Sequence, residues 1–304
     1  MSEGAEITRK EFLFALGAVA VVPVVKADTA KTTGHPKVLL VVAHPDDEYT
    51  FAATVYRITK ELHGTVDQVV ITNGEAGYRY SQLAEQYYGA ALTDEHVGRA
   101  RLPEIRRKET LAAGRVLGIR HHHFLEQQDS RFTLDATEPL HIWNTAHITD
   151  WLTTLMSREH YDFVFTLLPT AGTHGHHKAA TILALRAVEN LPREDRPAVL
   201  AGDPAPHAEP DLHYTTLTDF PVTTPWPDAP VFRFDRTSQF GFNHSLNYQI
   251  VVNWVIAEHK SQGLFQTDCN KHDEERFWLL AEGSPEALDQ TRTLFAKLNH
   301  PDSK

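Results

Sequence analysis

Residues 37–48, Lys-Val-Leu-Leu-Val-Val-Ala-His-Pro-Asp-Asp-Glu, join an unbroken apolar run to a polar turn. The apolar part ends at Ala43 and is rich in Val and Leu, which predicts a strand that is buried on both faces. Unbroken hydrophobicity of this kind is typical of a strand in a parallel sheet. Ligands bind at the carboxyl ends of such strands, so the polar residues from His44 to Glu48 form the first part of a candidate site.

Apolar strands and helical segments alternate along the rest of the chain. Strands are expected at 66–72, 121–125, 161–168 and 197–201, and helices at 48–62, 103–117, 139–158, 178–190, 249–259 and 269–282. This alternation predicts βαβ units. The expected fold class is therefore α/β, a Rossmann-like and mainly parallel sheet flanked by helices, with a smaller irregular C-terminal part. Two stretches, 73–102 and 202–230, interrupt the alternation, and the first is expected to cover the mouth of the site.

The first 27 residues resemble a signal peptide. The basic pair Arg9-Lys10 precedes an apolar run over residues 12–25, which is shorter than the ~20 residues that a membrane-spanning helix needs. The pair is similar to the twin-arginine export signal, with Lys in place of the second Arg. We therefore expect residues 28–304 to form a single exported domain, periplasmic or extracellular. The alternatives for the N-terminal run are an uncleaved membrane anchor and a buried helix.

The composition limits the classes of function. The chain has 304 residues, with 29 Lys and Arg against 40 Asp and Glu, a net charge of −11. This balance argues against nucleic acid or an anionic membrane surface as the main partner and favours a neutral or weakly charged substrate. Cys269 is the single cysteine, so a metal site must use His and carboxylate ligands. The sequence contains no P-loop, no G-x-G-x-x-G and no G-x-S-x-G motif, which disfavours NTPases, dinucleotide enzymes and serine hydrolases.

Two loops carry the residue types of a metal site. In the first, His44 and Asp47 stand three positions apart and can bind one cation, while Asp46 can take a proton from water. The second, residues 173–178 (Thr-His-Gly-His-His-Lys), follows the strand expected at 161–168. A catalytic zinc usually has three protein ligands, so the second loop can supply the ligand that the first lacks. The alternatives are a turn with a helix cap in the first loop and solvated histidines in the second.

From about residue 37 to residue 262, the sequence resembles the PIG-L/LmbE-like zinc-dependent N-acetylglucosaminyl deacetylases. The His-Pro-Asp-Asp motif of that family corresponds to residues 44–47, and its His-Pro-Asp-His motif to residues 174–177. Weaker similarities lie at 72–77, 106–109 and 257–262. The resemblance implies that residues 28–304 form one PIG-L/LmbE-like deacetylase domain.

The resemblance also implies a role for each matched residue. The implied Zn²⁺ ligands are His44, Asp47 and His177. Asp46 is the implied general base, and His174 steadies the oxyanion or protonates the leaving amine. Arg106 and Asp129 are implied substrate contacts. The implied reaction is the zinc-dependent removal of the N-acetyl group from an N-acetylglucosamine-type substrate, either an amino-sugar small molecule or a glycoconjugate.

One departure from the family pattern leaves alternatives open. Gly175 and His176 stand where the family has Pro and Asp, so the carboxylate that would orient His174 is missing. One alternative is an amidase that acts on another acylated amino sugar or conjugate, and a second is a non-catalytic sugar- or metal-binding protein. A phosphoesterase would need a second metal and more carboxylates. Iron or cobalt is an alternative to zinc for a site of two His and one Asp.

Overall fold

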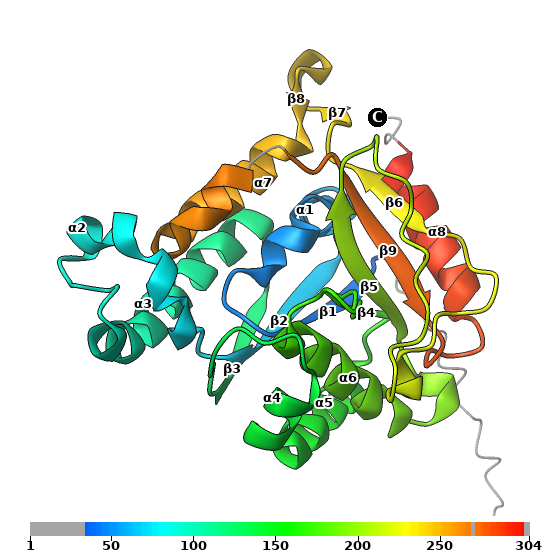
Figure 1. Cartoon of the computed structure of the whole chain (residues 1–304). Helices are drawn as coiled ribbons and strands as arrows, with labels where there is room; N and C mark the ends of the chain where they lie inside the picture. The colour runs from blue at the N-terminus through cyan, green and yellow to red at the C-terminus, as the bar shows by residue number, and fades with distance from the viewer. Residues whose placement is uncertain (1–33, 269–270, 301–304) are drawn as a thin grey trace, which may run out of the picture. The chain divides into compact units, whose positions relative to one another are not determined.

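The computed structural model describes residues 34–268 and 271–300, so the expected signal peptide lies outside the described residues. All described residues belong to one compact unit. This unit contains a seven-stranded sheet with the strand order β3-β2-β1-β4-β5-β9-β6 (Figure 1). Strands β1 to β5 pair in parallel, which confirms the α/β class and the mainly parallel sheet.

Helices cover both faces of the parallel strands. These strands are β1 (Lys37–Val42), β2 (Thr65–Thr72), β3 (His121–Gln127), β4 (Phe163–Leu167) and β5 (Ala198–Ala205). In β1, Val38 and Leu40 belong to one apolar core, while Leu39 and Val41 belong to a second. Because successive side chains of a strand point to opposite faces, every apolar residue of β1 is buried. The unbroken apolar run therefore follows from helices on both sides of the sheet.

The two cores are completed by two groups of helices (Figure 1). The first core includes residues of α1 (Ala52–Lys60), α3 (Glu95–Leu117), α7 (Tyr248–Glu258) and α8 (Ala287–Asn299). The second core includes residues of α5 (Thr145–Glu159) and α6 (Gly175–Glu189), and α4 (Thr137–Ile142) packs against α6. Pro103, expected at a helix start, lies inside α3 instead. Within residues 34–268 and 271–300, no helix combines the length and the hydropathy that crossing a bilayer requires.

The C-terminal part differs from the expectation. The helix expected over 269–282 is wrong for the described residues from 274 onward, which form the strand β9 (Glu274–Leu280). This strand pairs antiparallel with β5 and with β6 (Phe232–Asp235). A separate two-stranded ribbon, β7 (Gln239–Phe240) and β8 (Leu246–Asn247), precedes α7. The sheet therefore extends through the region that was expected to be irregular.

Two charged residues explain why β9 is a buried strand. Glu275 accepts hydrogen bonds from the backbone N–H groups of Ala53 (2.8 Å) and Thr54 (2.9 Å), in the first turn of α1. Nε of Arg236 also donates to Glu275, at 3.0 Å. Arg276 donates to backbone carbonyls of the segment that follows β5. Buried charges with partners of this kind are tolerated in a sheet interior, so both residues can lie on a strand covered on both faces.

The strand order places the candidate site. Strands β1 and β4 are neighbours at the centre of the sheet, but the chain leaves β1 toward β2 on one side and returns to β4 on the other. The loops that follow β1 and β4 therefore diverge at the carboxyl edge. In an open parallel sheet, ligands bind in the crevice at such a switch point. The first loop begins at His44 and the second contains His174 and His177.

Candidate active site

The loop after β1 is held by the side chain of Asp47. Oδ2 of Asp47 accepts hydrogen bonds from the backbone N–H groups of Ala43 (3.0 Å) and His44 (2.8 Å). Oδ1 lies 3.1 Å from Nε2 of His177, in the second loop. Burial alone would raise the pKa of Asp47, but His177 and His44 hold it well below its usual range. Asp47 is therefore a carboxylate that fixes its own loop and faces the other one.

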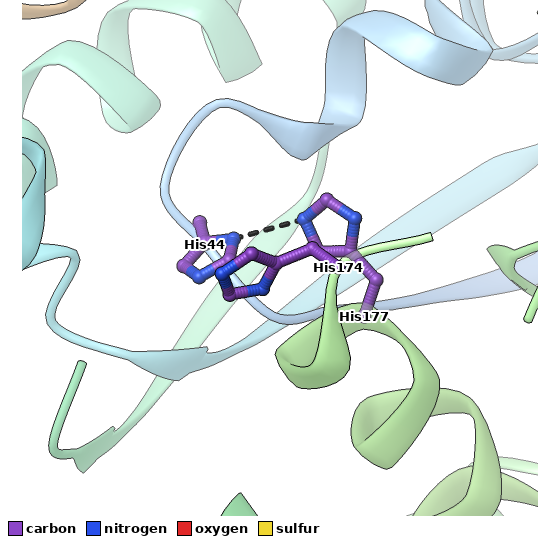
Figure 2. A group of neighbouring side chains, drawn as sticks. All are labelled: His44, His174 and His177. Atoms are coloured by element: carbon purple, nitrogen blue, oxygen red, sulfur yellow. Dashed lines mark hydrogen bonds between the residues drawn. The ribbon is translucent and has the colours of Figure 1, made fainter. Parts of the chain in front are cut away.

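His44, Asp47 and His177 bring three possible ligand groups together. Nδ1 of His44 lies 2.9 Å from Nε2 of His177 and 3.7 Å from Oδ2 of Asp47. Figure 2 shows the rings of His44 and His177 facing each other, with His174 beside them. Ligand atoms on one tetrahedral zinc, at ~2.0–2.1 Å from the metal, lie roughly 3.4 Å apart. The observed separations are close to that value, so this set of two imidazoles and a carboxylate fits a zinc-like cation.

His174 stands at the start of α6 as its N-cap. Its Nδ1 accepts a hydrogen bond from the backbone N–H of His176, at 3.1 Å, so the neutral ring carries its proton on Nε2. Burial, together with the neighbouring His44 and His177, lowers the pKa of His174 to about 3. The ring is therefore neutral at pH 7 in this arrangement. A neutral ring of this tautomer can donate a hydrogen bond from Nε2 to an oxyanion.

Asp46 lies on a strained turn that Arg106 holds. The φ angle of Asp46 is 150°, a conformation that residues with a side chain rarely adopt. Nη2 of Arg106 donates to Oδ2 of Asp46 at 2.5 Å and to the carbonyl of Pro45 at 2.8 Å. Nη1 donates to the carbonyl of Gly74 at 2.6 Å. Both Nη groups are thus engaged with the protein, and a substrate contact by Arg106 stays a prediction.

The surroundings of Asp46 shift its titration toward neutral pH. Burial, with a smaller contribution from the nearby charge of Asp47, raises the pKa of Asp46 to about 6, against the opposing effect of the Arg106 guanidinium. A base works best when its pKa lies near the operating pH. This pKa suits a general base, and the role of Asp46 stays a prediction.

A cavity of about 320 Å³ opens beside these residues. Its wall includes His44, Asp46, Asp47, Arg106, Asp129, His174 and His177. Aromatic side chains complete the wall: Tyr49, Tyr78, Tyr80 and Phe132. Tyr78 and Tyr80 belong to the 3₁₀ segment Glu75–Tyr80, within the stretch that was expected to cover the mouth of the site. The residues expected at the site thus line one cavity.

Asp129 is buried in the cavity wall, and both of its carboxylate oxygens have protein neighbours. Its Oδ2 accepts a hydrogen bond from the backbone N–H of Ala76 at 3.2 Å, and its Oδ1 lies 3.4 Å from Nδ1 of His176. The expected substrate contact by Asp129 therefore stays a prediction. His176, which the sequence marked only as a departure from a family pattern, is buried between Asp129 and His44.

A second buried pair lies under the first loop, and sequence reasoning missed it. Nε2 of His259, at the end of α7, lies 2.6 Å from Oε1 of Glu48. The amide of Gln68 in β2 donates to the other carboxylate oxygen of Glu48, at 3.2 Å. His259 and Glu48 lie 211 positions apart in the sequence, so spacing could not reveal the contact. The pair fastens the turn that carries Asp46 and Asp47 to the body of the protein.

Comparison with known proteins agrees with this geometry. The family model PIG-L, described as GlcNAc-PI de-N-acetylase, matches residues 39–188. Residues 39–188 therefore carry a match to the PIG-L family. The matched segment contains both loops of the site and ends within α6. The strands β5, β6 and β9 and the helices α7 and α8 lie beyond it.

Individual proteins that resemble this chain are more distant. The probable N-acetyl-α-D-glucosaminyl L-malate deacetylase 2 of Bacillus cereus is 24% identical over 164 residues, which make up 54% of this chain. The match spans 66% of that relative, slightly less than two thirds of its length. Two solved structures share the fold, a deacetylase triple mutant from the teicoplanin biosynthetic pathway and a zinc-inhibited teicoplanin deacetylase. Their TM-scores are 0.51 and 0.50, and each is 17% identical, covering 81% of this chain and 98% of its own.

Proposed function

We propose that this protein is a metal-dependent hydrolase that removes the N-acetyl group from an N-acetylglucosamine-type substrate. One observation carries the proposal. Nδ1 of His44, Nε2 of His177 and the carboxylate of Asp47 converge within 2.9 to 3.7 Å on the wall of a cavity that also contains Asp46. Zn²⁺ is the proposed metal because its usual ligands include His and Asp. When bound, zinc supplies a Lewis acid that polarises the acetyl carbonyl and makes water more acidic.

The protein's own residues supply the proton transfers. Asp46 takes a proton from the attacking water, whose oxygen adds to the acetyl carbon. The Nε2–H group of His174 donates a hydrogen bond to the carbonyl oxygen as that oxygen becomes negative. Asp46 then returns the proton to the amide nitrogen, the C–N bond breaks, and acetate and a free amine leave. Arg106 keeps Asp46 aimed at the cavity throughout.

The proposed substrate is an amino sugar, free or as part of a glycoconjugate. A volume of about 320 Å³ lies at the small end of the range of ligand pockets. Such a cavity holds the acetylated sugar, while the rest of a conjugate stays outside. Tyr80 and Phe132 are partly exposed beside the cavity and offer aromatic faces for the sugar ring. We further propose that the protein acts outside the cytoplasm, an assignment that rests on the sequence of residues 1–27.

The experiment that tests the function measures acetate and free amine from the metal-loaded protein. The substrates are monomeric, oligomeric and lipid-linked N-acetylglucosamine compounds, with other acylated amino sugars as a second panel. Asp46→Asn is the variant expected to lose activity, and Asp289→Asn, an exposed change on α8, is its matched control. Turnover of the second panel alone would favour an amidase that acts on another acylated amino sugar or conjugate. Full metal occupancy without release from either panel would favour the non-catalytic binding protein.

A further inference from the structure

His176 faces the edge of the His44 ring that the candidate ligand set leaves free. Nδ1 of His44 points toward His177, and Nε2 of His44 lies 3.1 Å from Nδ1 of His176. The side chain of His176 is completely buried, on the first turn of α6. The two sides of one imidazole are thus occupied differently, one by the ligand set and one by another imidazole.

The other neighbours of His176 define its environment. Oδ1 of Asp129 lies 3.4 Å from Nδ1 of His176, and Oγ of Ser130 lies 3.5 Å from Nε2. The rings of Trp143 and His174 pack against it, with centroids 5.2 and 4.6 Å away. His176 therefore has a polar neighbour at each ring nitrogen and aromatic rings beside it, which restrains its orientation.

Gly175 makes this arrangement possible. Its backbone N–H donates to the carbonyl of Thr133 at 2.7 Å. A Cβ atom at position 175 would lie 2.3 Å from the carbonyl oxygen of Asp135. Proline at this position would lose the hydrogen bond and place its ring near that oxygen. Glycine therefore lets the segment that carries Asp129 and Ser130 lie against the start of α6, where both meet His176.

We propose that His176 is a positioning residue that accepts a hydrogen bond from Nε2–H of His44. A neutral imidazole has one protonated nitrogen and one lone pair. With the proton held on Nε2, the lone pair of His44 is on Nδ1, directed at the space between His177 and Asp47. A second partner that fixes the tautomer is usual for a histidine that binds a metal. The inference rests on the proposed function in that it takes His44 as a ligand.

A different explanation uses the same atoms. His44, Asp129 and His176 each offer a possible ligand atom within 4.8 Å of the others, so they could hold a metal of their own. If His44 also binds the first metal, it must lose the protons of both ring nitrogens to bind two. A hydrogen bond needs no such loss, and the 3.1 Å separation suits it. The stoichiometry of metal binding separates the two explanations.

The test measures the affinity of the full chain for Zn²⁺ by competition with a chromophoric chelator, together with the absorption spectrum of the Co²⁺-loaded protein. His176→Phe removes the acceptor and is expected to weaken binding about 10- to 100-fold, as loss of such a partner does. His176→Asn offers an amide oxygen near the position of Nδ1 and is expected to restore most of the affinity. His123→Phe is the matched control, since His123, on β3, packs against Trp151 of α5 and is not part of the cavity wall.

The outcomes are distinct. One metal per chain, weakened binding and an altered Co²⁺ spectrum in His176→Phe, and rescue in His176→Asn would support the proposal. Wild-type Zn²⁺ affinity in a folded His176→Phe protein would overturn the proposal. It would also be overturned if the wild-type chain binds two metals and His176→Phe binds one. If His176→Phe does not fold, His176→Gln replaces it, because its amide reaches the Nε2 position and should not rescue. Since these readouts need no turnover, a protein that fails to release acetate would refute the function without touching this inference.

Discussion

Carboxylates, histidines and arginines lie at both ends of the parallel strands, but the pKa of Asp67 at the amino ends and that of Asp46 at the carboxyl ends are shifted in opposite directions. At the amino ends, Asp67 of β2 accepts hydrogen bonds from Nε of Arg120 (2.9 Å) and from the hydroxyl of Tyr161 (2.6 Å). Burial would raise the pKa of Asp67, but Arg120 and Tyr161 hold it below its usual range. At the carboxyl ends, burial raises the pKa of Asp46 to about 6 and lowers that of His174 to about 3.

This contrast separates a stabilising cluster from a functional one. At the amino edge, the buried carboxylate of Asp67 has Arg120 as an opposite charge, so the ionised form of Asp67 stabilises the folded state. At the carboxyl edge, several imidazoles face one another and two carboxylates share a turn, so the group as a whole favours the binding of a cation. Groups with strongly shifted pKa values that gather in a cavity are typical of functional sites. Substitutions at the two edges should therefore change different measured quantities.

The largest effect is expected for Asp46→Asn. Loss of the general base should lower the rate of acetate release by about two to four orders of magnitude. The asparagine side chain can still accept the hydrogen bond from Arg106, so the metal content and the unfolding temperature should stay close to those of the wild type. Steady-state kinetics and elemental analysis of the same preparation check both parts. Turnover at the wild-type rate would remove Asp46 from the mechanism.

The main expected effect of Asp47→Asn is a loss of metal affinity. The substitution removes the negative charge that faces His44 and His177. Because a carboxylate ligand is exchanged for a neutral amide, we expect Zn²⁺ affinity to fall by a factor on the order of 100. Chelator competition measures the affinity, with Asp46→Asn as the neighbouring control. Equal metal affinity in the two variants would show that the adjacent carboxylates do not have separate roles.

Asp67→Asn should lower the stability of the protein without changing its activity. The variant keeps the site intact but weakens the ionic hydrogen bonds to Arg120 and Tyr161. We expect the free energy of unfolding to fall by about 1–3 kcal/mol, since a buried charged hydrogen-bond network is broken. Denaturant unfolding measures the loss, and kcat/KM should stay unchanged. If kcat/KM falls under conditions in which the variant is fully folded, then Asp67 at the amino edge influences the site at the carboxyl edge.

The smallest expected effect is the pH dependence of that loss. A carboxyl group whose pKa is lowered on folding stabilises the protein above its unfolded pKa, and this contribution disappears as the pH falls through the folded pKa. For Asp67, the wild-type protein should therefore lose more stability than Asp67→Asn between pH 7 and about pH 3. Unfolding curves of both proteins across this range measure the difference. Parallel curves would mean that Asp67 has the same pKa in both states.

The sequence predicted those parts of the molecule that local pattern determines. The apolar run of β1 and the motif that begins at His44 occupy adjacent positions, so a buried strand and its loop could be recognised together. The structure also brings His44, Asp47 and His177 to one cavity, although their roles stay predictions. The strand β9 was missed because Glu275 and Arg276 resemble residues of an exposed helix. Only their distant partners make a buried strand possible.

The same limit applies to His176. The sequence marked His176 only as a departure from a family pattern, and no spacing rule links it to the ring edge of His44. The contact depends on how closely the segment after β3 approaches the start of α6. That approach depends in turn on the missing side chain of Gly175. A pattern of residue types cannot encode such a distance before the chain is folded.

The contact between Glu275 and α1 has a practical consequence. The carboxylate of Glu275 binds the backbone N–H groups of Ala53 and Thr54, just after the turn that carries Asp46 and Asp47. A recombinant fragment that stops at residue 188, where the family match ends, would keep every side chain proposed for the reaction. Such a fragment would nevertheless lack Glu275, whose carboxylate accepts the hydrogen bonds from the start of α1. Removing residues 189–304 would thus disturb the turn that carries Asp46 and Asp47, as well as the core to which α7 and α8 contribute. Assays should therefore use a polypeptide that keeps residues 189–304.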